Sequence, residues 1–444
     1  MPLANRWEKG LAKFIRIVGV ALAALVPIRV SVVVLNGAAV VLTAQDNFST
    51  FNRCGPVDFL LAHFYPTLLW RRGNSSMADK KTIMLTVTEQ CNLNCSYCYE
   101  KNKSLSTMSL ETAINIVERE LTKEDGFDIC EIQFFGGEPF FKFDLIRDIC
   151  HYIWSKKWPK KYLCFATTNG TLVHGEIKKW LYDNRERFTC SLSLDGNRKA
   201  HNINRCNSYD LIDIDFFLQT WPLQTAKMTI SPESLPYLAD SIIFLHEKGI
   251  PFSNNLAYGV DWSDKKLLDI MNEQMERLAK YYIEHPDTPL CRMLDLHIEN
   301  VNYDYKVNRW CGAGVSLSAY DTAGTCYPCH LFQPMSSESK TAPEKLTAAF
   351  TDFNTMDPRC ADCPIYNVCP TCYGHNYAAT GDISKRDADL CRFTKLSTLV
   401  SSYIWLKKLE LYSQKELGLS DDQYRMIFDG AKRIQELLPA LMEQ

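Results

Sequence analysis

Residues 82–98 read TIMLTVTEQCNLNCSYC, and this stretch decides the fold. The β-branched residues of Thr82–Thr88 predict a strand, and Cys91, Cys95 and Cys98 follow it on one loop. Three thiolates at this spacing can hold three corners of a [4Fe–4S] cube and leave the fourth iron free to chelate a small molecule. A structural zinc site is the alternative, but it needs four ligands and usually takes them from CxxC pairs. The spacing therefore favours an iron–sulfur cluster.

An alternation of helices and strands continues from this loop. Apolar residues recur at helical spacing from Ala113 to Leu121, and each later strand is followed by a helix. The predicted strands are 82–88, 129–135, 162–167, 189–194, 227–231 and 252–257, and the later helices are 144–155, 176–184, 211–220, 235–248 and 264–284. This order predicts a parallel sheet. Six such units predict an α/β fold, a partial (β/α)6 TIM-like barrel, with functional residues at the C-terminal strand ends.

The cysteines are distributed unevenly. Of the 18 cysteines in 444 residues, eight fall between Cys311 and Cys391, where the regular periodicity has faded. We therefore predict four parts: an atypical N-terminal extension (1–76), the barrel core (77–285), a cysteine-rich cluster domain (286–395) and C-terminal helices (396–444). Tight cysteine clusters in a large chain are typical of intracellular metal-binding proteins rather than of secreted disulfide scaffolds. This favours a cytoplasmic location.

The first 76 residues differ in texture from the rest. Two apolar runs, 17–28 and 30–44, are interrupted by Pro27 and Arg29, and each is shorter than the roughly 20 residues that span a bilayer. Three interpretations remain: a signal or anchor, a poorly formed domain, or a translation start assigned too early, with Met77 as the true one. We favour the third, expect no membrane association, and expect a chain that begins at Met77 to bind its clusters. The net charge of −3, without a basic block, also gives no support to nucleic-acid binding.

Two further motifs follow predicted strands. GGEP (Gly136–Pro139) follows the second strand, and SLDG (Ser193–Gly196) follows the fourth, with His201 and Arg205 after it. By itself, GGEP would be an ordinary strand-to-loop turn. Together with the CxxxCxxC loop, these motifs make the chain similar to the radical S-adenosylmethionine (SAM) superfamily.

That resemblance implies a role for each motif. Cys91, Cys95 and Cys98 would hold the radical SAM [4Fe–4S] cluster. The residues implied to contact SAM are Gly136, Gly137 and Glu138 at its amino group, Ser193 and Arg205 elsewhere on SAM, and the backbone of Tyr97 at the adenine. The Tyr97 side chain would also suit simple core packing.

The cysteine-rich region carries a third pattern. Cys311 and Cys329 flank Gly324, and a CxxCxxxxxCxxC run over residues 360–372 precedes Cys391. A zinc ribbon would leave three of these cysteines unexplained. The pattern resembles the SPASM domain, which binds two auxiliary [4Fe–4S] clusters. The resemblance implies that the first auxiliary cluster takes Cys311, Cys329 and Cys372, and that the second takes Cys360, Cys363, Cys369 and Cys391.

The chain departs from the SPASM pattern at two places. Only Pro370 and Thr371 separate the last two cysteines of the run, where the family usually has three residues. The cysteine that sulfatase-maturating relatives carry just before the position of Cys311 has no counterpart in residues 304–310. Cys326 could complete the first auxiliary cluster or be a buried thiol, and the cluster could also be left open for substrate.

The resemblance implies an enzyme with SAM and three [4Fe–4S] clusters. A 5′-deoxyadenosyl radical would take a hydrogen atom from a peptide or protein, after electron delivery by a low-potential donor such as flavodoxin or ferredoxin. A ribosomally made precursor peptide is the favoured substrate. Anaerobic sulfatase maturation, which forms formylglycine from cysteine or serine, is the alternative. A non-catalytic iron–sulfur or zinc-binding scaffold is a third hypothesis, but a scaffold would need no SAM pocket.

One residue bears on the choice of substrate. Sulfatase-maturating relatives place an aspartate base directly after the cysteine that Cys329 matches, and this chain has His330 there. An imidazole can accept a proton near neutral pH, so His330 is a candidate catalytic base, although it could equally be a packing residue. The exchange favours a substrate other than a sulfatase.

Overall fold

The computed structural model describes residues 80–303, 310–338, 341–350 and 356–437. The predictions made for residues 1–76 lie outside this range. Within it, no helix combines the length and apolar character that crossing a bilayer requires.

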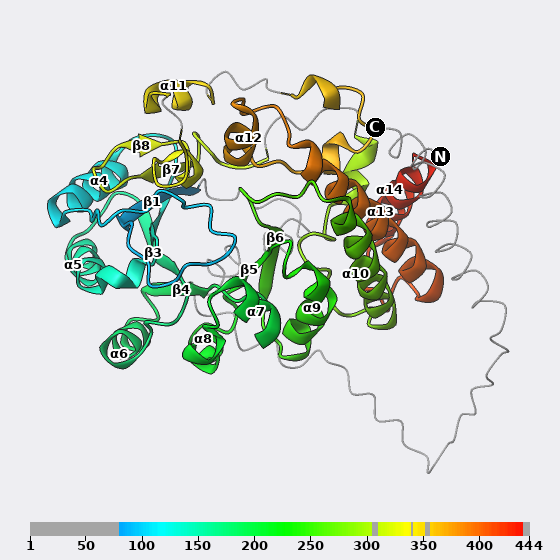
Figure 1. The fold of residues 1–444 in the computed structure, drawn as a ribbon, viewed down its shortest axis with the longest axis horizontal. Helices are drawn as coiled ribbons and strands as arrows, with labels where there is room; N and C mark the ends of the chain where they lie inside the picture. Colours follow the sequence, from blue (N-terminus) through cyan, green and yellow to red (C-terminus); the bar gives the residue numbers. More distant parts are fainter. Residues whose placement is uncertain (1–79, 304–309, 339–340, 351–355, 438–444) are drawn as a thin grey trace, which may run out of the picture. The chain divides into compact units, whose positions relative to one another are not determined.

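The six predicted strands all form, and all are parallel to their neighbours. They are β1 (Lys80–Thr88), β2 (Ile129–Gly136), β3 (Lys161–Thr168), β4 (Phe188–Leu192), β5 (Ala226–Ile230) and β6 (Phe252–Leu256). One sheet runs β4-β3-β2-β1-β7-β8, and β5 pairs with β6. A single parallel bridge between Ser193 and Lys227 joins the end of β4 to β5. The six strands are thus laterally continuous, which confirms the predicted α/β barrel-like arrangement (Figure 1).

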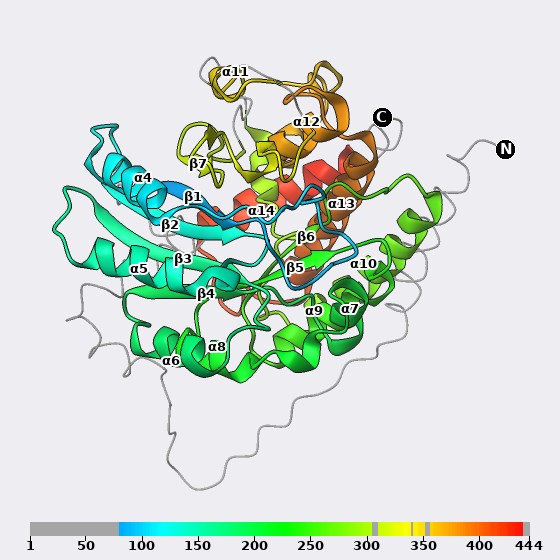
Figure 2. The ribbon, with the colours of Figure 1, turned by 60° about the vertical axis from the view of Figure 1, so that its left-hand side comes forward.

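Helices cover the outer side of these strands. They are α4 (Leu110–Thr122), α5 (Phe143–Trp154), α6 (Gly175–Asp183), α7 (Arg198–Asn204), α8 (Ile214–Thr220), α9 (Leu238–Glu247) and α10 (Lys265–Glu284). Figure 2 shows α5, α6 and α8 on one side of β2–β4. The prediction missed α7, a two-turn helix that begins where the Asn197 side chain accepts a hydrogen bond from the Ala200 amide. Such a short helix has too few residues for its apolar period to show in the sequence.

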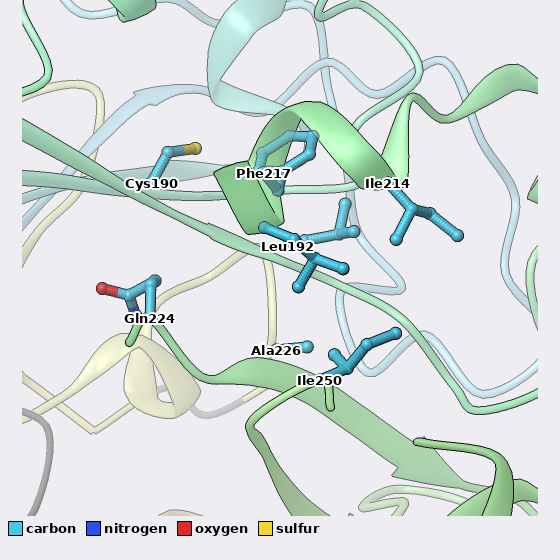
Figure 3. A pocket seen from close by; sticks show the side chains of 8 residues that line it. Cys190, Leu192, Ile214, Phe217, Gln224, Ala226 and Ile250 are labelled. Carbon is cyan, nitrogen blue, oxygen red and sulfur yellow. The ribbon is translucent and has the colours of Figure 1, made fainter. Parts of the chain in front are cut away.

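Strand alternation separates an outer from an inner face. Cys190 and Leu192 of β4 and Ala226 of β5 point toward α8, where they meet Phe217 (Figure 3). Residues at the alternate positions of these strands, such as Ser193 and Lys227, face the other side. The scattered cysteines on the outer face fill the core as small apolar residues: Cys130, Cys150, Cys164 and Cys190 are buried there.

The cysteine-rich region is attached to the barrel sheet. Its strand β7 (Leu317–Tyr320) pairs in parallel with β1 and antiparallel with β8 (Cys326–Tyr327). The other elements are α11 (Pro343–Ala348), α12 (Tyr373–Thr380), α13 (Ala388–Leu411) and α14 (Asp421–Glu436). Helix α13 begins before the predicted start of the C-terminal helices at residue 396, because the Asp387 side chain caps its first amides. Cys391 therefore lies on the first turn of a long helix rather than in a loop.

Candidate functional site

The CxxxCxxC loop lies directly after the C-terminal end of β1. Its three thiols lie close together. The Cys98 and Cys91 sulfurs are near enough to Cys95 to contribute to the raised pKa of its thiol. Burial is the main cause, and it raises the pKa of Cys95 to about 12. The Arg205 guanidinium opposes this shift of the Cys95 pKa. The Lys103 ammonium donates to the Cys98 sulfur at 3.0 Å. The loop thus gathers three sulfur donors beside two cations, Lys103 and Arg205, and the buried Glu100 carboxyl group.

These donors suit an iron–sulfur cube. Thiols whose pKa is raised by burial stay protonated until a positively charged group displaces their protons, which iron does. No three His, Cys, Asp or Glu side chains in the described part of the chain converge on one point as the ligands of a single metal ion would. A cube needs no such convergence, since each thiolate binds a different iron of the cluster. Three sulfur donors on one loop therefore fit three corners of such a cube.

The loop is fastened to two neighbouring strands. The Ser96 amide donates to the Asn204 carbonyl of α7 at 3.0 Å. On the other side, the Asn92 amide group donates to the Thr171 hydroxyl at 2.7 Å and accepts from Asn169 at 3.0 Å. These bonds tie the cysteine loop to α7 and to the segment that follows β3.

The two glycines of GGEP allow β2 to approach this loop. Gly136 has φ +146°, and a Cβ there would lie 2.0 Å from the Thr88 carbonyl oxygen. A Cβ on Gly137 would lie 2.5 Å from the Gln90 carbonyl oxygen. Any side chain at either position would push the backbone away from the cysteine loop. This close approach lets the Gly137 amide donate to the Thr88 carbonyl and the Glu138 amide donate to the Gln90 carbonyl.

Glu138 carries a buried carboxyl group beneath the loop. Its oxygens accept from the Thr168 hydroxyl at 2.7 Å, the Asn169 amide at 2.8 Å and the Phe140 amide at 3.2 Å. Burial raises the pKa of Glu138 to about 7, and these donors only partly oppose that shift. A cationic ligand such as an ammonium group would restore the ionised form.

We expect the Glu138→Gln variant to lose part of the pH dependence of the wild type's stability. Because the folded-state pKa is raised, the folded protein retains a proton that the unfolded chain releases, so stability falls as pH rises from about 4.5 to about 7. The whole effect is on the order of 3 kcal/mol. Ligand-free protein would be unfolded with urea anaerobically at several pH values. Equal pH slopes for the wild type and the variant would contradict the assignment.

Asp195 organises the SLDG motif. Its buried carboxylate accepts from the Arg205 guanidinium at 2.8 and 3.2 Å, from the Tyr97 hydroxyl at 2.9 Å and from the Thr229 amide at 2.8 Å. The Arg205 guanidinium also lies 5.4 Å from the centre of the Tyr97 ring. Tyr97 is therefore held by its side chain in the core, while its backbone belongs to the cysteine loop. Nearby, burial lowers the pKa of His201 to about 4, and its ring bonds to the Ser208 hydroxyl.

The sequence-predicted residues Tyr97, Glu138, Ser193 and Arg205 converge around the cysteine loop. Ser193 lies at the end of β4, where its amide donates to the Thr168 carbonyl at 2.8 Å. Thr168 also bonds Glu138, so the GGEP and SLDG motifs share a neighbour. The arrangement offers the buried Glu138 carboxyl group and the Asp195–Arg205 pair beside three thiols.

The three cysteines predicted for the first auxiliary cluster also lie together. Burial is the main cause that raises the pKa of Cys372 to about 11, with a contribution from Cys311. Burial also raises the pKa of Cys329, to which Cys372 and Cys311 contribute. Cys326 lies elsewhere, since its side chain packs against the barrel core and acts on Tyr320. Its side chain is half-buried, and both interpretations of Cys326 stay predictions.

The four cysteines predicted for the second auxiliary cluster form another group. Burial raises the pKa of Cys369 to about 12, and Cys391, Cys363 and Cys360 all contribute. A cavity of about 250 Å³ adjoins both groups. It is lined by Cys369, Cys372 and Cys391 and, from the barrel side, by Asn255 and Tyr258. The described side chains therefore leave open space beside both sets of sulfurs.

His330 packs at the open end of the barrel. Its ring centre lies 4.9 Å from that of Phe135, at the end of β2, and 5.5 Å from that of Tyr99, next to Cys98. Its Nδ1 is buried without a hydrogen-bond partner in the structure as described. Burial lowers the pKa of His330 to about 4, so the ring is neutral near pH 7 and only weakly basic. These contacts favour packing, and the catalytic-base role remains a prediction.

Several residues of the site escaped the sequence analysis. Asp195 lay inside a quoted motif but received no role. Asn169 follows β3 in the segment TTNGT, where an Asn-Gly pair at a strand end was an available signal. Lys103 and Arg386, which donate to cysteine sulfurs, give no sequence signal, because only the fold brings them to those thiols.

Comparison with known proteins gives partial matches. Residues 82–197 match a family described as a 4Fe–4S single cluster domain. The chain is 33% identical over 129 residues to a cysteine-type anaerobic sulfatase-maturating enzyme of Clostridium perfringens. This match covers 26% of this chain and 32% of that enzyme. The chain is also 30% identical over 138 residues to a radical SAM cyclopropyl synthase of Paramaledivibacter caminithermalis, which covers 27% and 28% of the two chains. The chain spans 60% or less of the length of these and other curated relatives.

The fold has a counterpart among solved structures. It resembles native anSMEcpe with bound AdoMet and the Cp18Cys peptide, with a TM-score of 0.56 and 17% identity. The match covers 74% of this chain and 99% of that chain. At this identity the likeness establishes the fold, and the chemistry must be argued from the residues.

Proposed function

Because this chain shares the motifs and the fold of radical SAM enzymes that carry a SPASM domain, we propose that it is a radical SAM enzyme that modifies a peptide or protein. One observation carries the proposal: the three-cysteine loop, the buried Glu138 carboxyl and the Asp195–Arg205 pair meet at the C-terminal strand ends of one barrel. A scaffold that only bound metal would need the cysteines alone. A buried acid and a buried guanidinium beside them suit an amino-acid ligand, which has an ammonium and a carboxylate.

Different residues of the chain would contact different parts of SAM. Glu138 would accept the amino group, while Ser193 and Arg205 would lie at other parts of the ligand. When bound and reduced, the cluster would supply the electron that cleaves SAM to methionine and a 5′-deoxyadenosyl radical. The two further cysteine groups would hold auxiliary clusters, three clusters in all, and a flavodoxin or ferredoxin would deliver electrons.

The proposed substrate is a short precursor peptide. His330 supports this choice over sulfatase maturation, because it stands where sulfatase-maturating relatives have an aspartate and is enclosed by Phe135 and Tyr99. Formylglycine formation is the second candidate. Its support is the 33% identity to a sulfatase-maturating enzyme and the fold shared with anSMEcpe.

The two substrates can be separated by mass spectrometry. Chemically reduced protein would be incubated with SAM and either a sulfatase-motif peptide or a short peptide encoded beside this gene. We expect a two-hydrogen mass loss, localised to a cross-link, in the neighbouring peptide, and none with the Cys95→Ala variant. Formylglycine in the sulfatase peptide would establish the second candidate instead. Stoichiometric zinc with little iron in anaerobically prepared protein would contradict both.

A further inference from the structure

Arg386 lies against the second group of cysteines and has a guanidinium that no carboxylate neutralises. It is 8% exposed, and its Nη1 donates to the Cys369 sulfur at 2.7 Å. Among described residues, no acidic side chain forms an ion pair with it. Its charge also interacts with Cys360 and Cys363, so one buried cation lies near most of the sulfurs of this group. A buried charge is costly unless an opposite charge compensates for it.

The surrounding residues hold Arg386 in this place. Its amide donates to the buried Asp357 carboxylate at 2.8 Å, and its carbonyl accepts from the Arg359 side chain. The guanidinium carbon also lies 5.1 Å from the centre of the Tyr366 ring. Asp357 is itself paired with Arg359. The backbone is therefore fixed on both sides, and the guanidinium has little freedom to turn away.

Two cysteines of the first group, Cys329 and Cys372, lie in a different electrostatic setting. Within the described ranges, the strongest influences on Cys329 and Cys372 are burial, neighbouring thiols and backbone amides, and for Cys372 also the Tyr258 hydroxyl. None of these carries a positive charge. Cys329 and Cys372 thus differ from Cys369 in electrostatic setting.

We propose that Arg386 raises the reduction potential of the second auxiliary [4Fe–4S] cluster. This inference rests on the proposed function, because it requires a cluster at Cys360, Cys363, Cys369 and Cys391. Four thiolates outweigh the positive charge of an oxidised cube, and one-electron reduction adds further negative charge. A buried guanidinium in contact with one sulfur stabilises the reduced form more than the oxidised one, because low dielectric strengthens the attraction. Arg386 acts through the cluster and is not a catalytic residue.

The test is a redox titration followed by electron paramagnetic resonance. The full-length chain with Cys91, Cys95 and Cys98 changed to alanine would retain only the auxiliary clusters, about 8 iron atoms per chain. In this background, Arg386→Met should lower the potential of the second cluster so that its reduced-to-oxidised ratio falls at least tenfold, which is about 59 mV for one electron. The first cluster would serve as an internal reference.

Two further variants make the result specific. Arg386→Lys keeps a cation and should retain most of the potential. Lys395→Met removes a cation that acts on Cys391 without contacting it, and should change the ratio less than Arg386→Met does. An unchanged potential in Arg386→Met with full iron content would overturn the inference, as would loss of the cluster from both Arg386 variants, which would make the residue a requirement for assembly. Absence of iron from the triple-alanine background would instead contradict the proposed auxiliary clusters.

Discussion

Replacing Cys91, Cys95 and Cys98 together by alanine is expected to remove one cluster and to abolish SAM cleavage. The protein should fall from about 12 to about 8 iron atoms per chain, since the other two cysteine groups are untouched. The three thiols occupy one loop and lie close enough to influence each other, as the ligands of one cluster would. Iron and sulfide analysis would measure the clusters, and chromatography would measure 5′-deoxyadenosine.

The matched control is Cys130→Ala. Cys130 is as buried as any cysteine of the chain and lies on β2, but its side chain faces the helices on the outer side of the barrel. This variant should keep all its iron and its SAM cleavage. If it loses as much iron as the triple variant, the scattered cysteines are not merely core residues. Retained SAM cleavage in the triple variant would disprove the assigned role of the loop.

Replacing Asp195 by asparagine should have the largest effect on stability. The Asp195 and Arg205 side chains are 0% and 9% exposed, so the change leaves a buried guanidinium without its counter-charge. Breaking such a pair from one side costs about 3–5 kcal/mol. The Tyr97 hydroxyl and the Thr229 amide also lose a charged acceptor, so the cysteine loop should loosen and SAM should bind more weakly. Urea unfolding and equilibrium SAM binding would measure the two effects.

A surface pair provides the comparison. Arg198 and Asp210 are 63% and 55% exposed, and Asp210→Asn should cost less than about 1 kcal/mol. The double variant Asp195→Asn/Arg205→Met should recover part of the lost stability, because it removes the stranded charge. If Asp195→Asn costs no more than Asp210→Asn, the buried pair does not hold the site together.

The barrel could be predicted because its signals are local. Strand alternation and helical spacing depend on residues near each other in the sequence. All six strands and the long helix α10 follow their predicted ranges within a few residues. The short α7 and the pairing of β7 with β1 were missed, since a two-turn helix has little periodicity and the partner strand lies more than 200 residues away.

The sequence by itself determined the cysteine groupings, because metal ligands must recur at short, fixed spacings, and it placed the GGEP and SLDG motifs after particular strands. Only the tertiary structure decided which charges accompany these groups. It pairs Asp195 with Arg205, buries Glu138 beneath the loop, encloses His330 between two aromatic rings and directs Arg386 at Cys369. It also sets Cys326 apart from the cysteines near it in sequence. Burial and the pairing of charges depend on the side chains that surround a group, and the fold assembles those from distant parts of the chain.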